Sequence, residues 1–190
     1  GNNVNYFQRR VFFMSKEQFE YKIRPTTEMD IPSITSFMDR VLHADPKAAL
    51  AIDPVSIDTL QAWIANGHSI IATLPDDGII GHQAVDLWPE SGWYEVRTAL
   101  VDPIYRGHGI NTDMKKFIIK AVYDGDSDAT ISGFTHPESA SRGILTKLNF
   151  DELPMDEVPD EFFSLCDPAK CVKATSVDCG CKVYVLKKPL

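Results

Sequence analysis

The sequence predicts one α/β domain built around a mixed, mostly antiparallel central sheet flanked by helices. Three segments of strand character, at 68–74, 79–88 and 93–102, are joined by short turns and predict an antiparallel meander. Segments with apolar residues at helical spacing lie before and after this meander. The chain has 190 residues, of which 44% are hydrophobic and 24% charged, so it is long enough for one full core.

The elements before the meander are a strand and two helices. The alternating residues 21–24 predict a first strand. A helix is expected over 30–42, with Asp30 as its N-cap and an apolar stripe along one face. A second helix is expected over 53–67, opened by an Asp-Pro pair and closed by Gly67.

The elements after the meander alternate between helix and strand. A helix is expected over 109–124, a strand over 129–135 and a further helix over 137–148. An acidic, proline-bearing stretch follows at 151–163, and the chain ends in a strand over 182–188.

The domain organisation that follows is simple. Residues 1–18 are expected to be a loosely held N-terminal arm, partly derived from the expression vector, and 19–190 a single domain. A cysteine-containing insert at about 151–181 interrupts the C-terminal part of that domain.

Composition excludes some partners and suggests a compartment. The formal net charge of −8 argues against binding to nucleic acid or to an anionic membrane, since both need a positive field. No apolar run reaches the ~20 residues of a membrane span, and the first residues do not read as a signal peptide. Reduced thiols and a cytoplasmic location are therefore expected.

The turn "VDPIYRGHGI" at 101–110 has the composition of an anion-binding site. A helix N-terminus offers about four free N–H groups, glycine allows close approach, and Arg106 adds a cation. A Walker loop is absent, and a dinucleotide fingerprint fits poorly because Gly109 is followed by Ile110, Asn111 and Thr112. The remaining alternative is that the glycines serve only a tight strand-to-helix turn.

The same ten residues resemble the acetyl-coenzyme A motif of the Gcn5-related N-acetyltransferase (GNAT) superfamily, V-x-P-x-Y-R-G-x-G-[IL]-G. "IRPTTEMDIPSI" and "ILTKLNF" resemble two other segments of that family, and the order of elements agrees over about 21–150. The resemblance implies the GNAT fold and acetyl-CoA as cosubstrate. The residues that it implies in CoA binding are Leu100, Val101, Arg106, Gly107, His108, Gly109, Ile110 and Asn111.

Two residues are candidates for the base that acetyl transfer to an amine requires. Glu95 lies eleven residues before Arg106, where many family members carry a glutamate, and alternation places it on one face with Arg97 and Val101. A structural ion pair is its alternative role. His136 follows the strand at 129–135, and its alternative role is that of a histidine at a helix start.

The chain departs from the family pattern at four positions, one of which is Glu138 in place of an earlier asparagine. Asn111 replaces the last small residue of the CoA motif. Leu145 stands where the family carries the tyrosine that acts as general acid, and Asn149 stands where it carries glycine. Ser139, Ser141 or water would then have to protonate the thiolate, or the protein binds acyl-CoA without efficient transfer.

The cysteines form a late cluster. Free thiols are expected and no metal is assigned, with a zinc site or a disulfide as alternatives. The four residues are Cys166, Cys171, Cys179 and Cys181.

The sequence therefore predicts an N-acetyltransferase that moves acetyl from acetyl-CoA to a primary amine of a small molecule or peptide by direct attack. Helices within 30–66 and the acidic stretch 151–163 are expected to hold the acceptor. The alternative is a non-catalytic acyl-CoA sensor on the same fold, and a homodimer is possible.

Overall fold

A computed structural model gives the fold of the chain, and it describes residues 12–16, 19–52, 54–137, 139–165 and 180–187. The strands are β1 (Phe12–Lys16), β2 (Phe19–Pro25), β3 (Ser69–Thr73), β4 (Ile79–Leu87), β5 (Tyr94–Val101), β6 (Ile131–Thr135), β7 (Asp151–Leu153) and β8 (Lys182–Leu186). The α-helices are α1 (Ile31–Ala44), α2 (Pro46–Ala51), α3 (Ile57–Ala65), α4 (Ile110–Gly125) and α5 (Ser141–Lys147). Short 3₁₀ turns are η1 (Glu28–Asp30), η2 (Pro103–Tyr105), η3 (Met155–Glu157) and η4 (Asp160–Leu165).

All eight strands join one sheet in the order β1-β2-β3-β4-β5-β6-β8-β7. Every neighbouring pair is antiparallel except β5 and β6, which are parallel. The expected meander is present as β3, β4 and β5, joined by short turns because each strand pairs with the next. The predicted mixed, mostly antiparallel sheet flanked by helices is confirmed.

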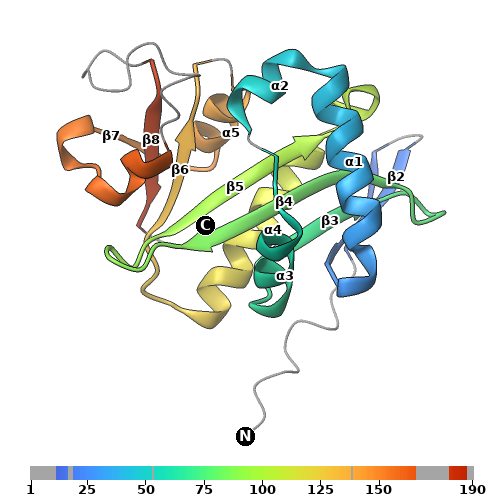
Figure 1. Ribbon diagram of the computed structural model, residues 1–190, viewed down its shortest axis with the longest axis horizontal. Coiled ribbons are helices and arrows are strands. Elements are labelled where there is room, and N and C mark those ends of the chain that lie inside the picture. The colour runs from blue at the N-terminus through green and yellow to red at the C-terminus, as the bar shows by residue number, and fades with distance from the viewer. Residues whose placement is uncertain (1–11, 17–18, 53, 138, 166–179, 188–190) are drawn as a thin grey trace, which may run out of the picture.

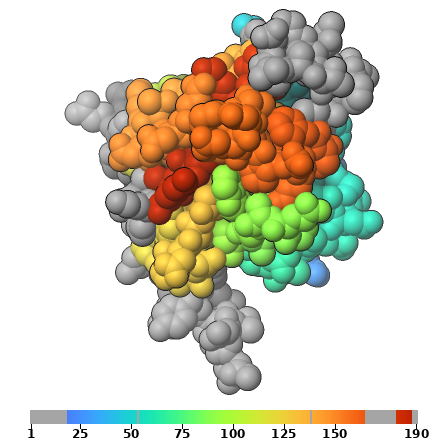
Figure 2. All heavy atoms as spheres, turned by 90° about the vertical axis from the view of Figure 1, so that its left-hand side faces the viewer, coloured from blue at the N-terminus to red at the C-terminus, as the bar shows by residue number. Residues whose placement is uncertain are grey.

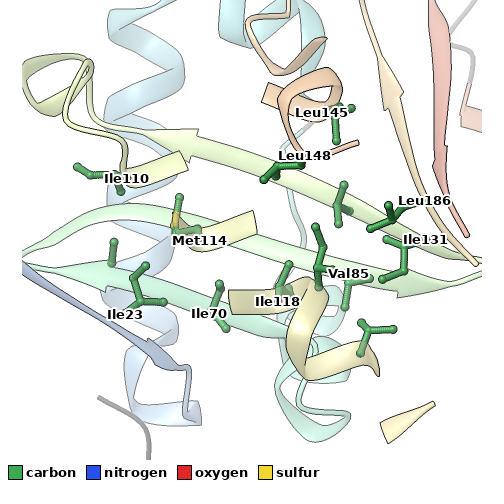
Figure 3. Close-up of a cluster of buried hydrophobic side chains, with 14 of the residues drawn as sticks. Ile23, Ile70, Val85, Ile110, Met114, Ile118, Ile131, Leu145, Leu148 and Leu186 are labelled. Carbon is green, nitrogen blue, oxygen red and sulfur yellow. The ribbon is translucent and has the colours of Figure 1, made fainter. Parts of the chain in front are cut away.

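Helices cover both faces of this sheet (Figure 1). On one face, α1 and α3 bury Ile34, Phe37 and Leu60 against Ile71 and other residues of the central strands. On the other face, α4 lies across the strands, and Figure 3 shows the apolar cluster that fills the space between them. The long central strands β4 and β5 therefore have helices on both sides. Packing against α4 places these strands beside the start of that helix.

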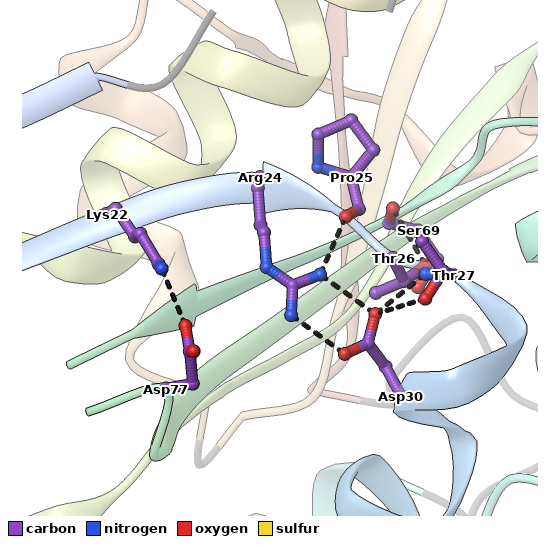
Figure 4. Close-up of polar contacts among 8 residues, drawn as sticks. All are labelled: Lys22, Arg24, Pro25, Thr26, Thr27, Asp30, Ser69 and Asp77. Carbon is purple, nitrogen blue, oxygen red and sulfur yellow. Dashed lines mark hydrogen bonds and ion pairs between the residues drawn. The ribbon is translucent and has the colours of Figure 1, made fainter. Parts of the chain in front are cut away.

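Asp30 is the N-cap residue of α1, as predicted, but its side chain makes no capping bond to that helix. Asp30 has helical backbone angles, and its carboxylate accepts bonds of 2.8 Å each from Arg24 Nη1 and Nη2 (Figure 4). It also accepts a 2.8 Å bond from the backbone N–H of Thr27. The side chain therefore ties η1 to β2 instead of capping α1.

The second predicted helix, expected over 53–67, is shorter in the structure. α3 begins at Ile57, because the Ser56 hydroxyl accepts the backbone N–H of Thr59 at 3.1 Å and caps the helix. Gly67 follows the helix with φ +71°, in agreement with its predicted role as the stop. Of the Asp-Pro pair expected to open this helix, Pro54 lies before it and Asp53 lies outside the described residues.

Three elements were not expected from the sequence. The strand β1 lies within the predicted arm and pairs with β2 over 12–16. The helix α2 is capped by Asp45, whose side chain accepts the backbone N–H groups of Lys47 and Ala48. The short strand β7 adds an outer edge to β8.

The acidic stretch 151–163 packs onto the turn between β4 and β5. Phe162 is fully buried and stacks on Trp88 at a centroid distance of 4.9 Å. Glu161 accepts the backbone N–H groups of Glu90 and Ser91 at 3.1 and 2.8 Å. In Figure 2 this orange segment lies against the green hairpin. The side chains of Phe162 and Glu161 thus attach this stretch to the turn between β4 and β5.

Candidate active site

The strands β5 and β6 separate shortly after they meet. Their parallel register contains two residue pairs, Tyr94 with Ile131 and Glu95 with Ser132. Figure 1 shows the two strands diverging from that end, so the C-terminal half of β5 has β4 on one side and an opening on the other. The pairing of β5 with β6 thus ends at Glu95, before residues 96–101, which lead to the glycine turn.

A bulge interrupts β5 beside this opening. His82 is opposite Leu100 and Ala84 is opposite Arg97, so three steps along β5 match two along β4. Thr98 has φ +46°, which is unusual for a β-branched residue. The bulge places Val96 and Val101 in the same cluster beneath α4. The prediction that Val101 shares a face with Glu95 is therefore wrong, because strict alternation stops at the bulge.

His82 holds the bulge from β4. Its imidazole is fully buried, with Nε2 3.0 Å from the Ser69 hydroxyl and Nδ1 3.3 Å from the Thr98 hydroxyl. Burial lowers the pKa of His82 to about 3, so the ring is neutral at physiological pH.

The turn after β5 brings glycine backbone to the start of α4. Asp102 accepts the backbone N–H of Ile104 at 3.1 Å and starts η2. Gly107 and Gly109 have φ of +85° and +84°, in the left-handed region that favours glycine. Gly109 is the N-cap of α4, so the free N–H groups of the first helical turn point out of this turn.

A pocket of about 340 Å³ opens where β5, the glycine turn, α2 and α5 meet. All of the residues that the resemblance implies in CoA binding line it except His108. Its lining residues from β5 and the turn are Ala99, Leu100, Val101, Tyr105, Arg106, Gly107 and Gly109, and those from α4 are Ile110, Asn111 and Thr112. Those from α2 and its end are Lys47, Ala48, Ala51 and Ile52, and those from 139–144 are Ser139, Ala140, Ser141 and Ile144.

Arg106 forms an ion pair within the protein. Its Nη1 lies 2.5 Å from Asp45 Oδ2, and its Nε donates to the Val101 carbonyl at 3.1 Å. The ion pair with Arg106 holds the pKa of Asp45 below its usual value. Arg106 therefore joins the glycine turn to the start of α2 and shapes the pocket between them.

A second basic residue lies behind the pocket wall. Lys115, one turn into α4, is 1% exposed, and its Nζ donates to Asn111 Oδ1 at 2.7 Å. Burial lowers the pKa of Lys115 to about 7. Lys115 and Asn111 are polar, whereas the residues around them are apolar or small. The sequence analysis did not single out Lys115.

Glu95 lies away from this pocket, near the start of β5. It is 3% exposed, and its Oε2 accepts a 2.8 Å bond from Trp88 Nε1. Burial raises the pKa of Glu95 to about 7, against the opposing effect of Arg97. Its carboxyl group therefore titrates near neutrality, as a base for amine deprotonation should. The ion pair with Arg97 that was the alternative is not formed, since Arg97 Nη1 binds Asp86 Oδ2 at 2.7 Å.

The histidine candidates lie at the edge of the site. His136 is half-buried directly after β6, and its carbonyl accepts the backbone N–H of Ser139, which lines the pocket. His108 is exposed in the glycine turn and packs on Phe19 at a centroid distance of 5.0 Å. Neither ring belongs to the pocket lining.

Two of the departures from the family pattern, Leu145 and Asn149, lie in and just after α5. Leu145 is 1% exposed and faces Gly133 of β6, where an added Cβ would lie 2.8 Å from Leu145 Cδ1. No hydroxyl group is therefore available at this position. Asn149 has φ +61°, a conformation that asparagine tolerates in place of glycine.

A second cavity, of about 640 Å³, lies between α3 and the ends of β4 and β5. Asp58, His68, Asp86 and Tyr94 contribute polar groups to its lining, and Trp63 contributes its indole. Trp63 Nε1 donates to Asp86, which is directly opposite Glu95 in the sheet. An acidic cavity thus lies next to the buried glutamate.

The structure tests the expectations on metal binding and on membrane spans over its described residues only. Cys166, Cys171 and Cys179 lie outside the described residues, and Cys181 precedes β8. Among the residues that the structure does describe, no group of three or more His, Cys, Asp or Glu side chains could hold a metal ion. None of the described helices is long and apolar enough to cross a membrane.

The lining from α2 is the part of the site that sequence reasoning missed. Asp45 followed by Pro46 is the same Asp-Pro signal that was taken as a helix start at the helix expected over 53–67. The short, alanine-rich stretch after it did not stand out as an element.

No protein-family model and no curated protein matches the sequence, whereas solved structures do. A GNAT-family acetyltransferase from Staphylococcus aureus Mu50 aligns with a TM-score of 0.64 and 15% identity, over 87% of this chain and 97% of that one. An acetyltransferase from Agrobacterium tumefaciens C58 aligns with a TM-score of 0.59 and 18% identity, over 98% and 99%.

N-acetylglutamate synthase from Neisseria gonorrhoeae, in complex with coenzyme A and N-acetyl-glutamate, is a third similar structure. It aligns with a TM-score of 0.63 and 18% identity over 90% of this chain, which spans 35% of the synthase. At these identities the likeness concerns the fold. The chain has the fold of the GNAT acetyltransferases, as the resemblance in the sequence implied.

Proposed function

We propose that this protein is an N-acetyltransferase that uses acetyl-CoA to acetylate a primary amine. The observation that carries the proposal is the pocket at the start of α4, where the glycine turn, the free helix N–H groups and the open side of β5 meet. Such a pocket suits an elongated ligand with a diphosphate at one end and an acyl thioester at the other. The GNAT fold gives this arrangement a precedent.

The diphosphate would bind at the N-terminus of α4, against Gly107, Gly109 and Asn111. The pantetheine arm would run along the open side of β5, with hydrogen bonds to the backbone of Leu100 and Val101. The bulge at Thr98 supports this placement because it turns backbone groups out of the ladder with β4.

In the proposed reaction, the neutral amine attacks the thioester carbonyl. A C–N bond forms, the C–S bond breaks, and one amine proton leaves. Glu95 would accept that proton, directly or through water, because its pKa of about 7 keeps an ionised fraction at neutral pH. The CoA thiolate, a fair leaving group, would take a proton from Ser139, Ser141 or water.

The acceptor amine would approach from the cavity between α3 and the sheet. Asp58 gives that cavity a negative charge that suits an ammonium group, whereas Asp86 is already paired with Arg97. Trp63 and Tyr94 add aromatic surface. Asp86 is opposite Glu95, so an amine held there would be next to the proposed base. The expected substrate is therefore a small cationic amine.

The test is a product assay with the purified chain. Acetyl-CoA is incubated with a panel of di- and polyamines, amino acids and N-terminal peptides, and thiol release is followed together with the mass of the product. The proposal expects at least one amine to gain 42 Da with a matching release of CoA, an increment fixed by the chemistry of acetylation. CoA binding without turnover of any amine would favour the alternative below.

The alternative is an acyl-CoA-binding protein without efficient transfer. Two observations favour it: Leu145 offers no acid where the family carries tyrosine, and Trp88 covers the carboxylate of Glu95. The alternative predicts CoA and acetyl-CoA binding of similar affinity and no amine-dependent thiol release.

A further inference from the structure

Lys115 is a lysine in the apolar core of α4. Its neighbours on the buried face of the helix are Ile110, Met114, Ile118 and Ile119. The side chain is 1% exposed, and its Nζ donates a hydrogen bond to Asn111 Oδ1. A long cationic side chain at such a position is unusual, because lysine is almost never fully buried unless it is paired.

No carboxylate balances this lysine in the described part of the chain. The ion pairs there involve other basic residues, and burial alone accounts for the lowered pKa of Lys115. A buried ammonium without a counter-ion is unfavourable and tends to lose its proton. A negatively charged ligand nearby would reverse that tendency.

The position of Lys115 directs it toward the pocket. Side chains on a helix lean toward its N-terminus, and the Nζ of Lys115 reaches back one turn to Asn111, which lines the pocket. Because Asn111 Oδ1 accepts from the lysine, the amide Nδ2–H of Asn111 is left to donate to a ligand.

Other charged groups border the same pocket. Arg106 is paired with Asp45, Lys47 lines the pocket from α2, and His108 and Tyr105 belong to the glycine turn. On α4 itself, Asp113 accepts from the Tyr21 hydroxyl and Lys116 is exposed. Lys115 differs from all of these because it lies behind the pocket wall, out of contact with water.

We propose that Lys115, acting with Asn111, is the buried cation that stabilises the diphosphate of CoA at the start of α4, and that it takes up a proton when the ligand binds. The inference rests on the proposed function, since it assigns a residue of the same site. It assigns a cationic partner for the diphosphate at a position that the sequence motif does not include.

Binding should then depend on pH in a defined direction. Above pH 7 the amine of free Lys115 is mostly neutral, so charging it on ligand binding requires a proton from solution. The affinity for CoA should therefore fall as the pH rises from 7.5 to 9, by at most about tenfold per pH unit for one proton.

The experiment is isothermal titration of CoA onto the wild-type chain, Lys115→Met and Lys116→Met. Each titration is run at pH 7.5 and 9, in two buffers of different ionisation enthalpy. Lys116→Met is the matched control, because it makes the same substitution at the exposed neighbouring position of α4. Wild type and control should take up a proton, whereas Lys115→Met should bind about 10–100-fold more weakly without proton uptake.

The substitution should leave the fold intact, since methionine fills a similar volume among apolar neighbours. Thermal unfolding of Lys115→Met should give a melting temperature equal to or above that of wild type. Asn111→Gly is a second variant that keeps Lys115 but removes its acceptor, and it should also reduce the affinity and the proton uptake.

The outcomes separate this inference from the proposed function. Wild type that binds CoA while Lys115→Met binds equally well, with the same proton uptake, would overturn the role of Lys115 and leave the CoA site standing. Wild type that fails to bind CoA would overturn the proposed function first, and the role of Lys115 with it.

Discussion

At the scale of single residues, Glu95 carries the chemistry of the proposal. Glu95→Gln keeps an acceptor for Trp88 Nε1 but cannot take a proton. If Glu95 is the base, we expect kcat for the acceptor amine to fall by about 10²–10⁴-fold while the Kd of CoA is unchanged. Steady-state kinetics and calorimetry measure the two quantities, and Glu90→Gln at the exposed hairpin turn is the control. A Glu95→Gln enzyme with full kcat would remove Glu95 from the mechanism.

The raised pKa of Glu95 also affects folding. Its carboxyl titrates near pH 7 in the folded chain and near 4.5 in a free side chain, so the folded state holds a proton that the unfolded state loses between these values. The contribution of Glu95 to stability therefore falls as the pH rises from about 4.5 to 7, by roughly 3 kcal/mol in total. Urea unfolding should show a gain in stability for Glu95→Gln over wild type at pH 8 that is absent at pH 4.5. An equal difference at both pH values would contradict the buried, titrating carboxyl.

Some residues of the site could be predicted from the sequence and others could not. Gly107 and Gly109 are recognisable because a strand-to-helix turn with an arginine and two glycines has few other uses. The pair of Lys115 and Asn111 could not be recognised, because a lysine at helical spacing is usually exposed. The cover that Trp88 places on Glu95 depends on the hairpin geometry, which local sequence does not contain.

At the scale of elements, the bulge in β5 determines which side chains face the pocket. Thr98 combines a positive φ with a hydroxyl group 3.3 Å from the ring of His82. Thr98→Val keeps the β-branch and loses the hydrogen bond, so we expect a loss of about 1–2 kcal/mol in the free energy of unfolding. Thr98→Ser keeps the hydroxyl and removes a methyl group, and we expect little loss. Urea unfolding of the two variants compares them directly, and equal stability would show that the bond to His82 does not hold the bulge.

Elements with a strong periodic pattern were predictable, whereas short or tertiary elements were not. The strands of the meander and the helix α4 follow from alternation and from helical spacing. The start of α3 was misplaced because an Asp-Pro pair and Ser56 are both helix-start signals, and the structure uses the second. Strands β1 and β7 exist because β2 and β8 offer them edges, a condition that only the assembled sheet creates.

At the scale of the whole molecule, the arrangement of the sheet creates the site. The parallel contact between β5 and β6 is limited to their first residues, so the sheet opens next to the start of α4. The meander could be predicted, but the placement of β8 between β6 and β7 could not, since it depends on pairing between distant segments. The GNAT fold is therefore predictable from this sequence only when the motif and the order of the elements are considered together.

The central claim is that the glycine turn at the start of α4 binds CoA, and two matched glycine substitutions test it most directly. Gly107 and Gly92 both have a positive φ, +85° and +71°, and an added Cβ at either meets no atom within 4 Å. Gly107→Ala and Gly92→Ala should therefore lose similar stability, about 1–2 kcal/mol each, from backbone strain. Gly107 lines the pocket, whereas Gly92 lies in the hairpin between β4 and β5.

The measurement is the thermal shift of both variants and of the wild type with acetyl-CoA, with ATP as an anionic control. At about 100 times the Kd, acetyl-CoA should stabilise the wild type and Gly92→Ala by about 2.7 kcal/mol, several degrees for a domain of this size. Gly107→Ala should show a much smaller shift, because its Cβ occupies the space of the diphosphate, and ATP should shift none of the three. Equal shifts for all three proteins, or no shift of the wild type with acetyl-CoA up to millimolar concentration, would contradict the claim.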